Sequence, residues 1–248
     1  MQGSEKVKME DTLKSQDTEE PIDILFYRPL GFRCAVLASK LHITPNMITI
    51  FSIFIGVAAG LLFYPADLKT NVIGMLLLVI ANLMDSTDGQ LARLTDNHTR
   101  LGRILDGLAG DLWFICIYLV CVFRLLNQGF SPWIWLLASA AGVCHIFHAA
   151  MADYYRNIHL FILKSSTGSE QDNSEAMTEE LRKISFREKP FEKICMWFYR
   201  NYTAQQEFFS PKMQIFLKVL RGRFGDNIPS DWKEKLRSAN KNNMPLTN

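Results

Sequence analysis

Residues 84–111 have the sequence MDSTDGQLARLTDNHTRLGRILDGLAGD, which places acidic side chains inside two long apolar stretches of the chain. A carboxylate at the centre of a membrane-spanning helix costs about 2.5–3.5 kcal/mol on insertion scales. Four acids share these stretches: Asp85, Asp88, Asp106 and Asp111. Their combined cost indicates a functional site. The alternative is a set of structural ion pairs with the neighbouring arginines, which are Arg93, Arg100 and Arg103.

The apolar stretches around this segment are long enough to cross a bilayer, which takes about 20 mostly apolar residues. Four stretches of the chain qualify, at residues 44–64, 71–94, 101–125 and 132–152. Gly56 and Gly60 in the first stretch have the spacing that lets two membrane helices pack closely. The sequence therefore predicts an all-α fold, a polytopic transmembrane helix bundle with four spans.

The rest of the chain is more polar than the spans. Residues 1–21 are mostly polar or charged, which is typical of a disordered tail. Residues 22–43 mix apolar with basic side chains, which predicts an interfacial amphipathic helix or, alternatively, a surface helix packed on the bundle. Residues 44–164 are predicted to form the transmembrane bundle. Residues 165–248 are predicted to form a linker and a cytoplasmic helical lobe.

Basic residues are distributed unevenly between the two ends of the predicted spans. Several precede the first span or surround the loop between the second and third spans, whereas Lys69 and Arg124 stand alone in the other two loops. Because loops rich in Lys and Arg stay in the cytoplasm, both termini and the loop beside the acids are predicted to be cytoplasmic. The sequence thus predicts an integral, multi-pass membrane protein whose acidic site faces the cytoplasm.

The spacing of the acids places them together at one end of the bundle. Asp85 and Asp88 are three residues apart and share one helix face, as do Gly102 and Asp106 on the next helix. The short loop between these helices makes them antiparallel neighbours, so their acidic ends meet. Mg²⁺ prefers carboxylate oxygens and also binds substrate phosphates. The acids therefore predict a magnesium-type site.

These residues also carry a family resemblance. The pattern Asp85-x2-Asp88-Gly89-x2-Ala92-Arg93, followed by eight residues and Gly102-x3-Asp106, resembles the signature of the CDP-alcohol phosphotransferase superfamily. The resemblance covers roughly residues 22–152. It implies a catalytic transmembrane bundle in which an acceptor hydroxyl attacks the β-phosphate of a CDP-activated donor and CMP leaves. It implies Mg²⁺ or Mn²⁺ held by Asp85, Asp88 and Asp106, and a CDP moiety bound near Gly89, Ala92, Arg93 and Gly102.

The chain departs from the family pattern in two ways. The family places a fourth Asp, a metal ligand and proposed general base, where this chain has Gly110. A one-residue shift on a regular helix rotates a side chain by about 100°. A bulge at Gly107 and Gly110 would return Asp111 to the site, so Asp111 is expected to join Asp106 as metal ligand and catalytic carboxylate. The alternative is that Asp111 pairs with an arginine. The family also usually has six spans, and a fragmentary chain would explain the difference.

The resemblance implies an enzyme of phospholipid biosynthesis. It favours transfer of a phosphatidyl-type group from CDP-diacylglycerol to an inositol-type acceptor. The alternatives are CDP-ethanolamine- or CDP-choline-type transfer to a lipid hydroxyl, an inactive or partial homologue, and a divalent-cation membrane protein. The expected partners are the CDP-activated donor, the alcohol acceptor and the lipid bilayer. A homodimer is left open, and nothing in the sequence indicates nucleic-acid binding.

Overall fold

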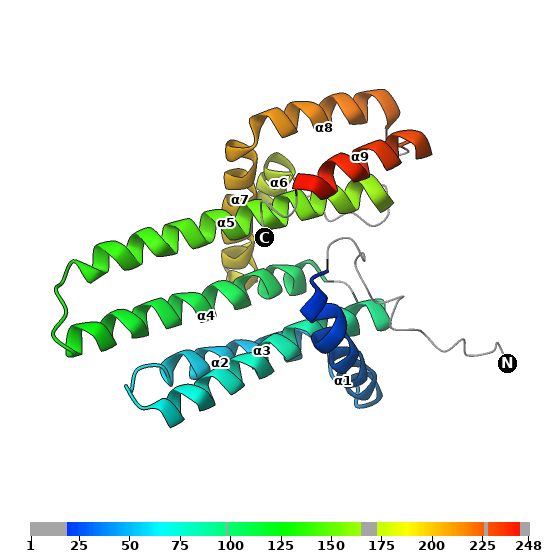
Figure 1. The fold of residues 1–248 in the computed structure, drawn as a ribbon. Helices are drawn as coiled ribbons and strands as arrows, with labels where there is room; N and C mark the ends of the chain where they lie inside the picture. The colour runs from blue at the N-terminus through cyan, green and yellow to red at the C-terminus, as the bar shows by residue number, and fades with distance from the viewer. Residues whose placement is uncertain (1–18, 98, 165–172, 226–227, 244–248) are drawn as a thin grey trace. The chain divides into compact units, whose positions relative to one another are not determined.

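The computed structural model describes residues 19–97, 99–164, 173–225 and 228–243. This part of the chain is all-α, as predicted, and forms two compact units that divide between Val143 and Cys144 (Figure 1). It consists of a π-helical turn, η2 (Asp23–Tyr27), and the α-helices α1 (Arg28–Lys40), α2 (Pro45–Leu61), α3 (Leu68–Leu94), α4 (Arg100–Asn127), α5 (Ile134–Lys164), α6 (Ser174–Lys183), α7 (Pro190–Phe209), α8 (Pro211–Phe224) and α9 (Ser230–Asn243).

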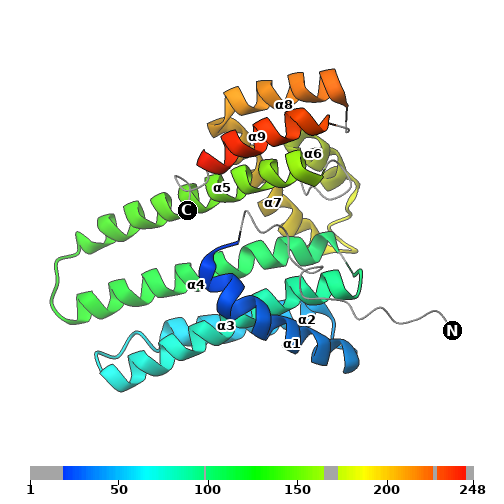
Figure 2. The same ribbon diagram turned by 45° about the vertical axis from the view of Figure 1, so that its right-hand side comes forward.

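Helix α2 is the centre of the first unit, because it packs against both α3 and α4 (Figure 2). Small residues make this close approach possible. A Cβ added to Gly56 would lie 2.3 Å from the indole of Trp113 on α4, and one added to Gly60 would lie 3.0 Å from Cys116 Sγ. On α3, a Cβ at Gly74 would lie 3.0 Å from the carbonyl oxygen of Ala59. The close packing predicted from Gly56 and Gly60 is therefore confirmed.

Three helices in the described residues are long and apolar enough to span a membrane: Leu68–Leu94, Leu101–Asn127 and Ile134–Leu163. The other predicted span corresponds to α2, which has 17 residues and rises about 26 Å, slightly less than the hydrocarbon core. Thr44 caps its start, where its side chain accepts a hydrogen bond from Met47 N. The helices indicate an integral, multi-pass membrane protein with three long candidate spans and one shorter apolar helix.

Helix α1 packs on α3, which accounts for one face of the predicted amphipathic helix. Gln90 Nε2 of α3 donates a hydrogen bond of 3.1 Å to the carbonyl oxygen of Arg28. A Cβ on Gly31 would lie 2.9 Å from the same nitrogen, so the glycine permits this contact. Leu37 and Leu41 are exposed elsewhere on this segment. The segment thus packs on the bundle and still presents apolar side chains, and its place in the membrane interface stays a prediction.

The second unit is built on the carboxyl-terminal half of α5. Its core combines residues of α5 and α8 with Ile228, and the buried members from the two helices are Tyr154, Ile158, Phe161, Ile162, Leu217 and Leu220. Helix α6 packs on α7, where Glu207 accepts hydrogen bonds from the backbone and side chain of Ser174. The described part of the predicted lobe is therefore helical. Most of the predicted tail, and residues 165–172 at the start of the predicted linker, lie outside the described residues.

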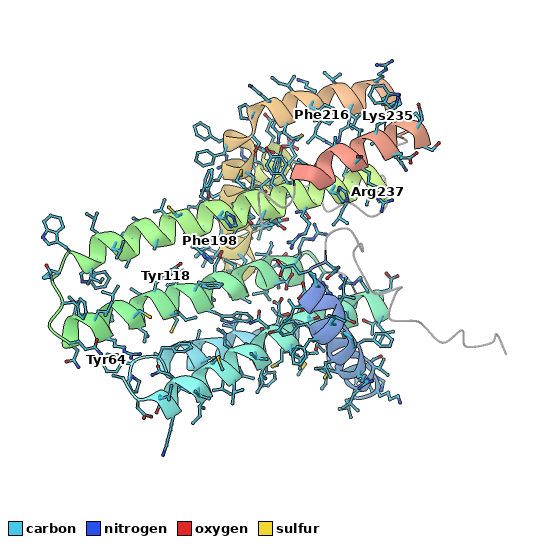
Figure 3. The ribbon with its side chains drawn as sticks, in the orientation of Figure 1. Tyr64, Tyr118, Phe198, Phe216, Lys235 and Arg237 are labelled. Atoms are coloured by element: carbon cyan, nitrogen blue, oxygen red, sulfur yellow. The ribbon has the colours of Figure 1, made fainter. Side chains whose placement is uncertain are left out.

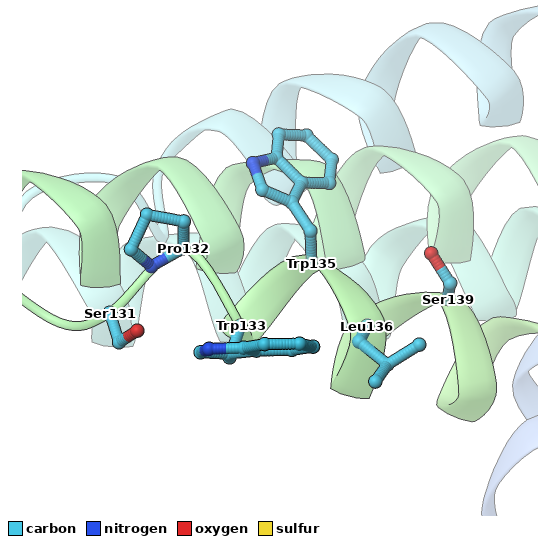
Figure 4. Close-up of a pocket in the computed structure, with 6 residues that line it drawn as sticks. All are labelled: Ser131, Pro132, Trp133, Trp135, Leu136 and Ser139. Carbon is cyan, nitrogen blue, oxygen red and sulfur yellow. The ribbon is translucent and has the colours of Figure 1, made fainter.

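Aromatic side chains gather at the end of the first unit that lies away from the acids. Tyr64 follows α2 and is half exposed (Figure 3), and Trp133 precedes α5 and is strongly exposed. Trp135 packs edge-on against Phe123 of α4. A pocket at this end is lined by Ser131, Pro132, Trp133, Trp135, Leu136 and Ser139 (Figure 4). Exposed Trp and Tyr at helix ends are typical of a membrane–water interface.

Arg124 of α4 joins α3 and the turn after α2 at the same end. Its Nη1 donates to the carbonyl oxygen of Phe63, at 2.9 Å, and to Asn71 Oδ1 of α3, at 3.2 Å. Since hydrogen bonds to charged groups contribute about 1.5–3 kcal/mol, Arg124→Met is expected to lower the unfolding free energy in detergent by about 2 kcal/mol. Exposed Arg33 on α1 provides the control Arg33→Met. Equal unfolding midpoints for the two variants would contradict this role of Arg124.

Candidate metal centre

Three carboxylates from two helices converge at the other end of the first unit. Asp85 and Asp88 of α3 and Asp106 of α4 each offer one ligand oxygen, and these atoms all lie within 4.8 Å of one another. Oxygens around Mg²⁺ at its usual ligand distance lie about 3–4 Å apart, so a small contraction would surround an ion. Three like charges at this spacing repel one another, and a divalent cation would offset the repulsion. The group could therefore hold a metal ion.

The turn between α3 and α4 brings these acids together. Helix α3 ends at Leu94, and the hydroxyl of the next residue, Thr95, donates to the carbonyl oxygen of Leu91. Asp96 follows with a φ of 49°, a left-handed conformation that Asp tolerates better than most residues. Thr99 then caps α4 by accepting a hydrogen bond of 3.0 Å from Gly102 N. The chain thus reverses within a few residues, and α3 and α4 both pack on α2, which holds their acidic ends near each other.

Helix α2 also reaches the site, through a residue that the sequence patterns did not single out. Thr49 Oγ1 donates a hydrogen bond to Asp88 Oδ2. The two residues are 2 % and 3 % exposed, whereas Asp85 and Asp106 are half-buried. The sequence feature that could have pointed to Thr49 is a hydroxyl one turn after Pro45, at the same membrane depth as the acids. That signal is weak, because the partner of Thr49 lies 39 residues along the chain.

Of the small residues of the signature, Gly102 lies where two helices approach closely. A Cβ on Gly89 would lie 3.4 Å from Nη2 of Arg93, so the guanidinium folds back over this glycine. A Cβ on Gly102 would lie 2.5 Å from Asn46 Oδ1 of α2. The packing of α4 on α2 therefore favours glycine at position 102, in addition to the predicted place of Gly102 near a nucleotide. Ala92 is half-buried on α3, one turn after Asp88.

The bulge expected between Asp106 and Asp111 is not present. Helix α4 is α-helical throughout Arg100–Asn127. Five residues of regular helix separate two side chains by about 140° around the axis, and the carboxylates grouped within 4.8 Å are those of the other three acids. Glycines at 107 and 110 lower the cost of an irregularity, but they do not impose one on an intact hydrogen-bond ladder. The role of Asp111 as a base stays a prediction.

The position of the family's fourth Asp is open in this structure. A Cβ added to Gly110 would meet nothing within 4 Å apart from its own helix backbone. Gly110 lies four residues after Asp106, on the same face of α4. The site therefore has room beside Asp106 where the family pattern has a carboxylate.

Comparison with known proteins assigns the bundle. The family model for CDP-alcohol phosphatidyltransferase matches residues 42–164, a range that contains α2 to α5 and all three grouped carboxylates. A stretch of 67 residues is also 37% identical to a protein of Aquifex aeolicus (strain VF5) named "Uncharacterized protein". That match covers 27% of this chain and 33% of the relative, so the chain spans about a third of the relative's length. Through residues 42–164, this chain belongs to the CDP-alcohol phosphatidyltransferase family, a phosphotransferase class.

Proposed function

We propose that this chain transfers a phosphatidyl-type group from a CDP-activated donor to an alcohol, with release of CMP. CDP-diacylglycerol is the favoured donor and an inositol-type alcohol the favoured acceptor. The observation that supports this most is the convergence of Asp85, Asp88 and Asp106 inside the range that matches the family. A diphosphate can approach these three carboxylates only if their negative charge is offset. A hard divalent cation bound by the carboxylate oxygens would offset it.

Each of these residues would have its own role in the reaction. Asp85, Asp88 and Asp106 would hold Mg²⁺ or Mn²⁺, whose charge when bound offsets that of the diphosphate and the leaving CMP. The nucleotide would bind along α3 near Gly89 and Ala92, whose small size suits a close approach. The guanidinium of Arg93 lies over Gly89, where its fork of donors suits phosphate oxygens.

The proposed reaction is a displacement at the β-phosphorus of the donor. A bond forms between the acceptor oxygen and this phosphorus, and the bond from the phosphorus to the oxygen that bridges to CMP breaks. The proton of the acceptor hydroxyl passes to a carboxylate, which must lie within hydrogen-bond reach or one water away. Asp106 is in the grouped site, and Asp111 is the second candidate for this step.

The proposed function is tested by CMP release from the purified full chain. CDP-diacylglycerol is offered with inositol, inositol phosphate, glycerol phosphate or serine, and CDP-ethanolamine and CDP-choline are offered with diacylglycerol. We expect CMP release with CDP-diacylglycerol and an inositol-type acceptor. Release only with diacylglycerol as acceptor would assign the alternative substrate class. No release with any pair would support an inactive homologue and contradict the proposal.

We also propose that the site faces the cytoplasm, on the basis of the uneven distribution of Lys and Arg between the loops. The prediction uses two exposed residues at opposite ends of the first unit, Lys69 at the start of α3 and Asn97 in the loop after α3, in a background without the five native cysteines. In intact cells, Lys69→Cys should react with a membrane-impermeant maleimide, and Asn97→Cys should react only after permeabilisation. The reverse pattern of labelling would show the opposite orientation.

A further inference from the structure

Thr49 makes a contact with the acid group that the family signature does not include. It lies in the second turn of α2, and its hydroxyl donates to Oδ2 of Asp88, the most buried of the three grouped carboxylates. The same hydroxyl oxygen lies 3.1 Å from the carbonyl oxygen of Pro45. A hydroxyl has one hydrogen, and hydrogen bonds to a charged acceptor are the stronger ones, so the Asp88 carboxylate is its favoured partner.

The packing around this contact fixes the position of the hydroxyl. Thr49 is β-branched, so its side chain has few rotamers available on a helix. Its neighbour Ile48 packs with Leu91 of α3 in a buried cluster, and Leu91 lies one turn after Asp88. Farther along α2, Gly56 and Gly60 hold the helix close to α4. The donor is therefore held by helix packing on both acidic helices.

The hydrogen bond from Thr49 leaves Asp88 able to bind a cation. An ionised carboxylate has about four lone-pair positions, and Thr49 occupies one of them. Side chains that hydrogen-bond to a metal ligand orient it, and their loss typically costs 10–100-fold in metal affinity. Without the hydroxyl, the buried Asp88 carboxylate would lose a neutral donor that favours its charged form.

We infer that Thr49 is a positioning residue, which orients the Asp88 carboxylate toward the divalent cation through its hydroxyl. This inference rests on the proposed function, because it assumes that Asp85, Asp88 and Asp106 hold the cation. Thr49 contacts Asp88, the residue proposed to bind the cation, and is not proposed to contact the reacting atoms. Its substitution should therefore change metal affinity, and it should change turnover only through the fraction of enzyme that has metal bound.

The test measures Mn²⁺ binding to the purified full chain, with the free ion detected by electron paramagnetic resonance. Thr49→Val keeps the shape of the side chain and removes the donor, and Thr49→Ser keeps the donor. The matched control is Ser52→Ala, since Ser52 is a fully buried hydroxyl on the same helix that donates to the carbonyl oxygen of Thr49. If Thr49→Val does not fold, Thr49→Ala replaces it.

We expect Thr49→Val to raise the dissociation constant for Mn²⁺ by about 10–100-fold, and Thr49→Ser and Ser52→Ala to change it by less than about threefold. Mn²⁺ affinity of Thr49→Val equal to that of the unmodified chain would overturn the role of Thr49 and leave the metal site intact. An unmodified chain that binds no Mn²⁺ would overturn the metal site of the proposed function, and the role of Thr49 with it. A lower melting temperature with unchanged affinity would show a structural role only.

Discussion

Asp88→Asn is expected to lower CMP release by about a thousandfold or more while the protein stays inserted in the membrane. The substitution keeps the size of the side chain and its acceptor for Thr49, but it removes a negative charge from the group of three acids. Metal-ion stabilisation of transition-state charge contributes several kcal/mol, and each 1.36 kcal/mol corresponds to a tenfold change in rate. The loss follows if the amide no longer supports cation binding.

The matched control for this experiment is Asp96→Asn. Asp96 is an exposed acid in the loop beside the site, outside the grouped carboxylates, and Asn also tolerates its left-handed backbone conformation. CMP release should be nearly unchanged in this variant, measured in the same membranes and at the same expression level. Substantial release by Asp88→Asn would show that the reaction does not depend on the grouped acids.

The second large effect separates Asp106 from Asp111. Asp106→Asn should weaken Mn²⁺ binding by about a hundredfold, because it removes one of three charged ligands. Asp111→Asn should change the dissociation constant by less than about threefold, since α4 is regular and turns Asp111 away from Asp106. Equal losses in both variants would mean that α4 adopts the bulged form when the metal binds.

The same two variants assign the proton acceptor. A general base contributes typically 10²–10⁴-fold to a rate. If Asp111→Asn loses about a hundredfold in turnover with unchanged Mn²⁺ affinity, Asp111 takes the acceptor proton without binding the metal. If turnover is also unchanged, the proton passes to the grouped acids, of which Asp106 is the candidate. Turnover and metal affinity must therefore be measured on the same preparations.

Hydropathy located the helices of the bundle well, but it did not locate all of their ends. The predicted span at 71–94 corresponds to α3 (Leu68–Leu94) and the span at 101–125 to α4 (Arg100–Asn127). The last predicted span ends at residue 152, whereas α5 continues to Lys164. Charged residues after the apolar run indicated an end. The helix continues because Ile158 and Phe161 pack into the core of the second unit.

The acids of the candidate site could be found from their cost in a membrane and from their spacing. The contribution of α2 could not be found in this way, because Thr49 and Asp88 are distant in sequence and only the packing of α2 on α3 brings them together. The sequence also allowed a bulge before Asp111 without requiring it. Whether a pair of glycines bends a helix depends on the surrounding packing. A Cβ at Gly107 or Gly110 would meet nothing within 4 Å apart from its own helix backbone, so no neighbouring side chain forces a bulge there.

Metal-dependent CMP release is the most direct measurement of the proposed chemistry. The purified full chain is stripped with EDTA, supplied with CDP-diacylglycerol and an inositol-type acceptor, and then given Mg²⁺ in excess of the chelator. We predict no CMP before the addition and rapid CMP release after it. CMP release at the same rate in EDTA, before any Mg²⁺ is added, would contradict a phosphotransferase that works through cation binding by Asp85, Asp88 and Asp106.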